Sequence, residues 1–123
     1  MGLEFRITSE IPQGKPHVAV LHLSGWLDAH SEGQLVEAVE RAKQEGAQFL
    51  LLDLAGVTTI TSAGLRGIQK SFGIMTPQGD PNSGRFKLCG AAPQVYEVLS
   101  TTGLLISIPM YEGADIAIDS FGA

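Results

Sequence analysis

The sequence predicts one α/β domain over residues 1–123, with a mixed, mainly parallel β-sheet and about four α-helices. A chain of 123 residues is long enough for one core of two layers. Its 44% hydrophobic and 17% charged residues are typical of a globular protein. Strand-like and helix-like segments follow one another in the order β-β-α-β-α-β-α-β-α. Such alternation after an initial hairpin indicates parallel strands with helices packed on them.

The chain begins with two predicted strands. Residues 3–9, LEFRITS, alternate between apolar and polar side chains, as expected of a half-buried strand. The turn-rich residues 12–16, PQGKP, separate them from a longer apolar strand at 17–26, HVAVLHLSGW. Two strands with a short turn region between them predict a hairpin.

A helix and a buried strand are predicted next. In residues 30–46, apolar side chains recur at helical spacing, and Gly46 is a suitable end. Ser31 followed by Gln34 matches a capping box at the helix start. The nearly all-apolar residues 48–54, QFLLLDL, predict a strand that is covered on both faces.

The second half repeats the alternation. A helix is predicted after residue 61 because its apolar residues share one face: Leu65, Ile68, Phe72 and Met75. Residues 76–84, TPQGDPNSG, predict a loop, which we interpret as a tolerated surface insertion. The remaining predictions are a strand at 85–90, a helix at 92–103, a strand at 105–111 and a helix at 113–121. Pro109 cannot donate to a ladder, so the last strand should lie at an edge or end there.

Composition argues against several classes of function. The net charge of −5 lacks the basic surface that a general nucleic-acid binder needs. No apolar run approaches the ~18 residues of a membrane span, and the first residues do not resemble a secretory signal. The single cysteine, Cys89, is expected to be a buried strand residue, and a reducing cytoplasm is the expected location.

The sequence contains few groups arranged for catalysis. Ser62 lies at a predicted strand–turn–helix, but Ile60 stands where a nucleophile elbow has its first glycine. The three histidines do not follow metal-ligand spacing, and no phosphate-binding glycine loop occurs, so no metal or cofactor is expected. Asp28 and Asp53 follow apolar strand residues and are interpreted as turn residues or local acceptors. A small serine hydrolase remains a remote alternative.

Two interpretations fit Ser62 in the stretch TTITSAGLRGI. Its hydroxyl, or that of Thr61, could cap the helix, which stabilises by roughly 0.5–2 kcal/mol. Alternatively Ser62 is a phosphoacceptor, since the small neighbours Ala63 and Gly64 would let another enzyme approach it. The free N–H groups and positive dipole end of a helix would tolerate a phosphate there.

Three motifs resemble the STAS domain family, which includes bacterial anti-sigma factor antagonists and domains of sulfate transporters. LSGWLDAHSEGQL is similar to the family's strand end before its first helix, and LLLDLAGVTTITSAGL to its signature DLSGVxFIDSSGL. KLCGAAPQVYEVLSTTGL resembles a third motif near the family's end. The resemblance covers nearly the whole chain. Thr61 replaces the signature's aspartate and Ala63 its second serine.

The resemblance implies a bacterial, cytoplasmic, non-enzymatic protein that binds an anti-sigma factor with serine kinase activity. Phosphorylation at Ser62, with Thr61 as the second candidate, would release that partner and so control sigma-factor-dependent transcription. The predicted contact residues are Asp28, Thr61, Ser62, Ala63, Gly64 and Arg66. A monomer is expected. The alternative is a STAS module that is never phosphorylated and works in another complex, such as a lipid-transport assembly.

Overall fold

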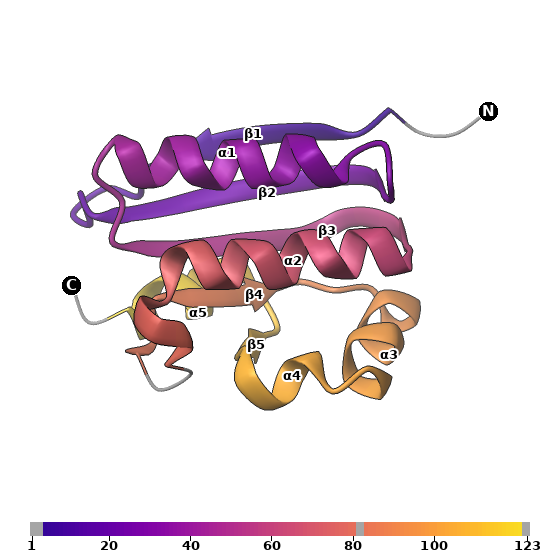
Figure 1. Ribbon diagram of the computed structural model, residues 1–123. Helices are drawn as coiled ribbons and strands as arrows, with labels where there is room; N and C mark the ends of the chain where they lie inside the picture. Colours follow the sequence, from indigo (N-terminus) through magenta and orange to yellow (C-terminus); the bar gives the residue numbers. More distant parts are fainter. Residues whose placement is uncertain (1–3, 81–82, 122–123) are drawn as a thin grey trace.

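The strands of the molecule form one five-stranded sheet in the order β1-β2-β3-β4-β5 (Figure 1). The computed structural model describes residues 4–80 and 83–121. β1 runs antiparallel to β2, and every later neighbouring pair is parallel. The strands are β1 (Arg6–Glu10), β2 (Val18–Leu27), β3 (Phe49–Ile60), β4 (Phe86–Cys89) and β5 (Met110–Tyr111). The predicted hairpin and the mainly parallel sheet are therefore confirmed.

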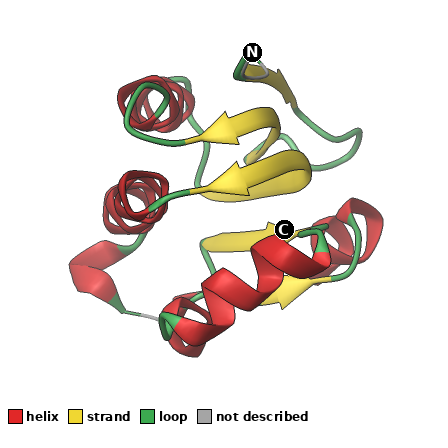
Figure 2. Ribbon diagram, turned by 90° about the vertical axis from the view of Figure 1, so that its right-hand side faces the viewer, coloured by secondary structure: helices red, strands yellow, loops and turns green. Residues whose placement is uncertain are grey.

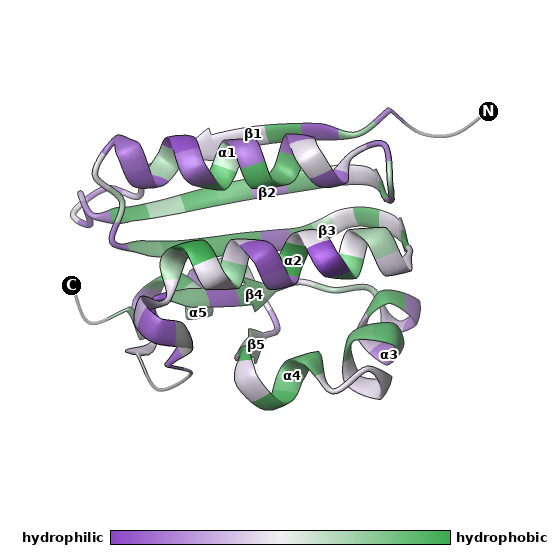
Figure 3. Cartoon of the chain, in the orientation of Figure 1, coloured by the Kyte–Doolittle hydropathy of each residue, from purple (hydrophilic) through white to green (hydrophobic). Residues whose placement is uncertain are grey.

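Helices cover both faces of this sheet (Figure 2). They are α1 (Glu32–Gln44), α2 (Ser62–Met75), the short 3-10 helix η1 (Pro77–Gly79), α3 (Pro93–Thr101), α4 (Leu104–Ser107) and α5 (Ala114–Ser120). α1 and α2 lie in front of the sheet in Figure 1, and both helices contain hydrophilic as well as hydrophobic residues in Figure 3. No helix of the described residues has the length and apolar character to cross a membrane.

The buried side chains form a core on each face of the sheet. Leu50 and Leu52 of β3 face α1 and α2, where Leu35, Val39 and Ile68 meet them. Leu51 between them points to the other face, where Val20, Cys89, Ala117 and Phe121 gather under α5. Alternate residues of one strand thus enter different cores, which explains the continuous apolar run in the sequence.

The predicted strand at 105–111 is wrong over most of its length. Gly103 adopts a left-handed conformation with φ of 80°, and the chain then forms the single turn of α4. Ile108 N–H donates to Leu104 O, so these residues bond locally instead of joining the ladder. Only Met110 and Tyr111 pair with β4, at the edge of the sheet directly after Pro109, which confirms the prediction for that proline.

The predicted capping box at α1 is also wrong. Ser31 is buried, and its hydroxyl donates to Trp26 O at 2.8 Å and accepts from Asp28 N–H at 2.9 Å. Its backbone is already helical, with φ of −103° and ψ of −9°, so the side chain turns back to the loop. Ser31 therefore holds the turn before α1 closed, instead of capping the helix.

The predicted loop at 76–84 falls partly outside the described residues, since 81 and 82 are not described. Its first part forms η1, and Thr76 before it is buried. The last predicted helix, near 113–121, is confirmed as α5, and its Ala117 packs under the sheet.

Candidate functional site

Thr61, not Ser62, is the N-cap of α2. Thr61 has an extended backbone, with φ of −111° and ψ of 177°, and its hydroxyl accepts from Gly64 N–H at 3.4 Å. Ser62 is the first helical residue and is exposed. Its hydroxyl has no hydrogen bond to any residue within 4–80 or 83–121. Helix capping therefore does not require Ser62, and its hydroxyl is open to solvent.

The small residues after Ser62 fit a close contact with the end of β2. Thr61 N–H donates to Leu27 O at 3.0 Å, which ties the cap to that strand. A Cβ atom on Gly64 would lie 2.2 Å from the same carbonyl oxygen, and Ala63 is only 8% exposed. The sequence interpretation took their small size as access for an enzyme; the structure shows that packing alone requires a glycine at 64.

The Asp28 turn lies beside this contact because Asp28 follows Leu27. Its carboxylate accepts from His30 N–H at 3.0 Å and from Ser31 N–H at 3.3 Å. The interpretation of Asp28 as a local acceptor is therefore confirmed. These bonds fix the loop that enters α1 next to the start of α2, so both loops can contact one partner.

Glu32 connects the exposed side of α2 to α1. Its carboxylate contacts Lys70 Nζ at 2.9 Å and Arg66 Nη2 at 3.6 Å. The hydrogen bond from Lys70 and the charge of Arg66 lower the pKa of Glu32 below its usual value. Arg66 remains 58% exposed in its side chain, one turn after Ser62. Local sequence patterns did not identify Glu32 as a residue of this site. Its partners are more than 30 positions away, and only helix packing brings them together.

The first turn of α2 favours negative charge. No acidic residue occupies it, and a helix N-terminus carries free N–H groups and the positive end of the helix dipole. Arg66 adds a cation within one turn. A phosphate on Ser62 would therefore be electrostatically compatible with the fold.

His22 lies far from Ser62 and is held by carboxylates. Its Nδ1 contacts Asp53 Oδ2 at 2.7 Å, and its Nε2 contacts Glu10 Oε1 at 2.5 Å. Burial alone would lower the pKa of His22, but the hydrogen bonds with Glu10 and Asp53 raise it above its usual value. Asp53 precedes the end of β3 by seven residues, or about 23 Å at 3.3 Å per residue. Neither residue can therefore act with Ser62, so His22 and Asp53 do not form a Ser-His-Asp triad with it.

The other groups considered from the sequence are structural. Cys89 is fully buried in β4, and desolvation together with the charge of Asp53 raises its pKa to about 12. Its thiol therefore stays protonated, as expected of a core residue. Within the described ranges, no cluster of three or more His, Cys, Asp or Glu side chains has the arrangement to hold a metal ion.

Comparison with protein families matches residues 11–117 to the STAS domain. The chain belongs to the STAS domain family. The match covers the sheet from β2 onward and most of α5. It places the start of α2, with Thr61 and Ser62, well inside this STAS domain.

Solved structures share the fold of this STAS domain at low sequence identity. An anti-sigma factor antagonist from Mycobacterium paratuberculosis is 20% identical with a TM-score of 0.81, covering 95% of this chain and 93% of that chain. The Bacillus cell fate determinant SpoIIAA in its phosphorylated form is 19% identical with a TM-score of 0.65, covering 95% and 98%. A sulfate transporter family protein from Wolinella succinogenes is 16% identical with a TM-score of 0.69, covering 90% and 87%. No curated protein matches this STAS domain.

Proposed function

We propose that this STAS domain is an anti-sigma factor antagonist whose binding is switched by phosphorylation of Ser62. The partner is an anti-sigma factor that is also a serine kinase, and the domain itself is a non-enzymatic binding module. It acts as a monomer in the bacterial cytoplasm and needs no cofactor. The single observation that carries the proposal is the free, exposed hydroxyl of Ser62 beside a cap that Thr61 supplies.

The similar structures support this kind of function. The protein from Mycobacterium paratuberculosis is named as an anti-sigma factor antagonist, and so is SpoIIAA, which has been solved both unphosphorylated and phosphorylated. Ser62 matches the serine that the STAS signature carries in its helix-start motif. The phosphoacceptor would lie where the fold already favours an anion, so modification changes the surface without unfolding the domain.

The proposed contact surface consists of exposed groups around Ser62. Thr61, Ser62 and Arg66 present their side chains from α2, and Asp28 borders them from the neighbouring loop. Ala63 and Gly64 contribute by holding α2 close to Leu27, since both are buried. A phosphate on Ser62 would place about two negative charges at the centre of this surface and weaken the complex.

Thr61 in place of the signature's aspartate keeps the cap but removes a charge. Both residue types are good N-caps, so the local backbone is preserved. A carboxylate beside Ser62 would repel the incoming phosphoryl group, and it would also be available to bind a kinase. Thr61 itself is exposed and remains the second candidate phosphoacceptor.

A second candidate function is a STAS module that stays unphosphorylated in another complex, for example a transport assembly. The similar structure of a sulfate transporter family protein favours it. In that case the same surface would bind constitutively, and Ser62 would serve as a contact residue.

Intact-mass measurement with a kinase-type anti-sigma factor and ATP tests the choice. Candidates for the kinase are those encoded next to this protein's gene. The antagonist proposal expects one phosphate on the wild-type protein, none on Ser62→Ala and one on Thr61→Val. A phosphate that persists in Ser62→Ala but disappears in Thr61→Val would move the switch to Thr61. Tight binding without any phosphate transfer would support the second candidate.

A further inference from the structure

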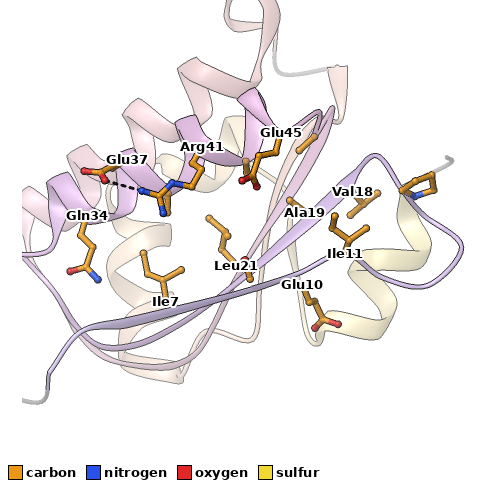
Figure 4. Close-up of a pocket in the computed structure, with 15 residues that line it drawn as sticks. Ile7, Glu10, Ile11, Val18, Ala19, Leu21, Gln34, Glu37, Arg41 and Glu45 are labelled. Atoms are coloured by element: carbon orange, nitrogen blue, oxygen red, sulfur yellow. Dashed lines mark hydrogen bonds and ion pairs between the residues drawn. The ribbon is translucent and has the colours of Figure 1, made fainter.

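A groove of about 760 Å³ runs between α1 and the edge of the sheet (Figure 4), and Ser62 is not among the residues that line it. Its floor includes Ile7 and Ser9 of β1 and Ala19 and Leu21 of β2, and α1 forms its wall. Ile7 lies opposite Leu23 in the ladder and Ser9 opposite Leu21, so these residues share the face on which α1 packs. We call this feature the α1–β1 groove.

The groove exists because α1 does not fill the space above the edge strand. α1 packs against the sheet through Leu35 and Val39, both fully buried, and it contributes the short side chains of Ala38 and Ala42 to the space beside them. Ala19, Ala38 and Ala42 line the groove, where larger side chains would close it. The hollow is therefore a lack of side-chain volume between well-packed elements, and its size falls within the range of ligand sites.

Along α1 the groove residues form one continuous stripe. They are Gln34, Glu37, Ala38, Arg41 and Ala42, which share one helix face, and Glu45, which directly follows α1. The stripe spans about three turns, or roughly 16 Å. Apolar residues lie toward the sheet and polar ones along the outer rim, as Figure 4 shows for Leu21 and Glu37.

The rim of the groove carries net negative charge. Two carboxylates, from Glu37 and Glu45, accompany the single guanidinium of Arg41, whereas the Glu10 carboxylate contacts His22 on the other face of the sheet. Arg41 Nη2 already contacts Glu37 Oε1 at 3.1 Å, so Glu45, directly after α1, has the less compensated charge. The whole chain also has a net charge of −5. An anionic lipid or a second copy of this chain would meet repulsion here, whereas a cationic ligand would be attracted.

The groove and the Ser62 surface lie on opposite sides of α1. The side that faces α2 carries Glu32, which bonds Lys70, and Lys43, which donates to Ile74 O at 2.9 Å. Neither residue lines the groove. A ligand in the groove would therefore leave the start of α2 open to its own partner.

We propose that the α1–β1 groove is a docking site for a basic amphipathic helix of a partner protein. Such a helix would lie beside α1 over β1, where the sheet lacks a covering helix. Its apolar side would contact Ile7, Leu21 and Ala38, and its lysines or arginines would face Glu37 and Glu45. The three-turn stripe matches the length of helix that such a groove accommodates. This proposal is independent of phosphorylation at Ser62.

The test uses a labelled synthetic peptide of leucine, alanine and lysine, about 14 residues long, or roughly 20 Å as a helix. Fluorescence anisotropy would measure its affinity for the full chain. We expect Glu37→Lys with Glu45→Lys to weaken binding about tenfold. The matched control is Glu40→Lys with Glu97→Lys, which changes net charge equally at exposed positions outside the groove. Equal weakening in both variants would overturn the proposal by showing non-specific attraction.

A second variant tests the groove without changing charge. Ser9 is exposed on the groove floor, and Ser9→Trp should fill the space while leaving the core intact. We expect it to abolish peptide binding, and NMR shifts in the wild type should map to Ile7, Ala38 and Ala42. Shifts confined to the start of α2, self-association of the protein through this face, or groove binding of dodecanoate in preference to the peptide would each contradict the proposal.

Discussion

Small side chains have opposite consequences on the two sides of α1. On the side toward α2, a Cβ atom added to Gly67 of α2 would lie 3.4 Å from side-chain atoms of Glu32 and Leu35 in α1. A Cβ atom added to Gly64 of α2 would lie against Leu27 O. On the side toward β1, Ala38 and Ala42 face open volume. A small residue therefore allows a close contact where another element packs against it. Where no element packs against it, the small residue leaves a hollow. The contact side fixes the position of Ser62, and the hollow side offers a groove.

The largest effect should come from adding one methyl group on the contact side. Gly64→Ala places Cβ 2.2 Å from Leu27 O, which is backbone and cannot move aside easily. We expect a loss of about 3 kcal/mol or more in the free energy of unfolding, measured by urea denaturation. Gly73→Ala on the same helix is the control, since nothing lies within 4 Å of its added Cβ. It should stabilise by up to about 1 kcal/mol. Equal stability of the two variants would refute the contact assignment.

Most of the strands and helices were predictable from the sequence. Apolar runs and helical spacing located four of the five strands and the longer helices, because burial on a sheet face fixes side-chain periodicity. The start of α2 was predicted from the change in period after Ile60, and the structure places Ser62 there, exposed. These features depend on neighbours along the chain, so the sequence shows them directly.

Features that depend on distant neighbours were not predictable in this way. Ser31 matched a capping pattern, yet its hydroxyl bonds Trp26 O, five residues earlier, within a tight turn. Residues 105–108 had strand composition, but the turn at Gly103 directs them into α4. The α1–β1 groove left no local signal, since alanine is common in helices whether or not a neighbour fills the space.

Filling the groove should raise stability modestly. Ala42→Leu adds apolar surface to the groove, which Ala19 and Leu21 also line. We expect a gain of about 1 kcal/mol or less in the free energy of unfolding. Gln44→Leu adds the same side chain to an exposed position on α1 outside the groove and should give no gain. A loss of stability from Ala42→Leu would mean that the hollow is already tightly packed.

The stability of the sheet behind the α1–β1 groove should depend on pH. His22 bridges Glu10 of β1 and Asp53 of β3, and these carboxylates raise its pKa above the unfolded value of 6.5. The stabilising contribution is thus fully present below about pH 6.5 and lost as pH rises through the higher folded pKa. We expect a change below about 1 kcal/mol, because the side chain is partly exposed.

Urea denaturation at pH values on both sides of 6.5 would measure this effect of His22. His22→Gln removes the titration, so its stability should lose this part of the pH dependence. A pH profile that is identical in the wild type and in His22→Gln would contradict the bridge between β1 and β3.

The smallest effect on stability should come from Ser62 itself, although it has the largest proposed role in binding. Thr61 supplies the cap, so Ser62→Ala should change the free energy of unfolding by less than about 0.5 kcal/mol, whereas Thr61→Ala should cost about 1 kcal/mol. Ser62→Asp should be neutral or slightly stabilising, because it places a negative charge at the helix N-terminus.

Partner affinity should separate these variants where stability does not. Ser62→Ala should bind a kinase-type anti-sigma factor as the unphosphorylated protein does, and it should not be released by ATP. Ser62→Asp should bind more weakly, but less weakly than the phosphorylated wild type, since aspartate carries one charge where phosphate carries about two. Titration at equal folded fraction, checked by circular dichroism, measures this difference. Equal affinity of Ser62→Ala and Ser62→Asp would show that charge at this position does not control binding. A fall in stability of both variants beyond that of Thr61→Ala would mean that Ser62 supports the fold, and the assignment of its hydroxyl as free for modification would be wrong.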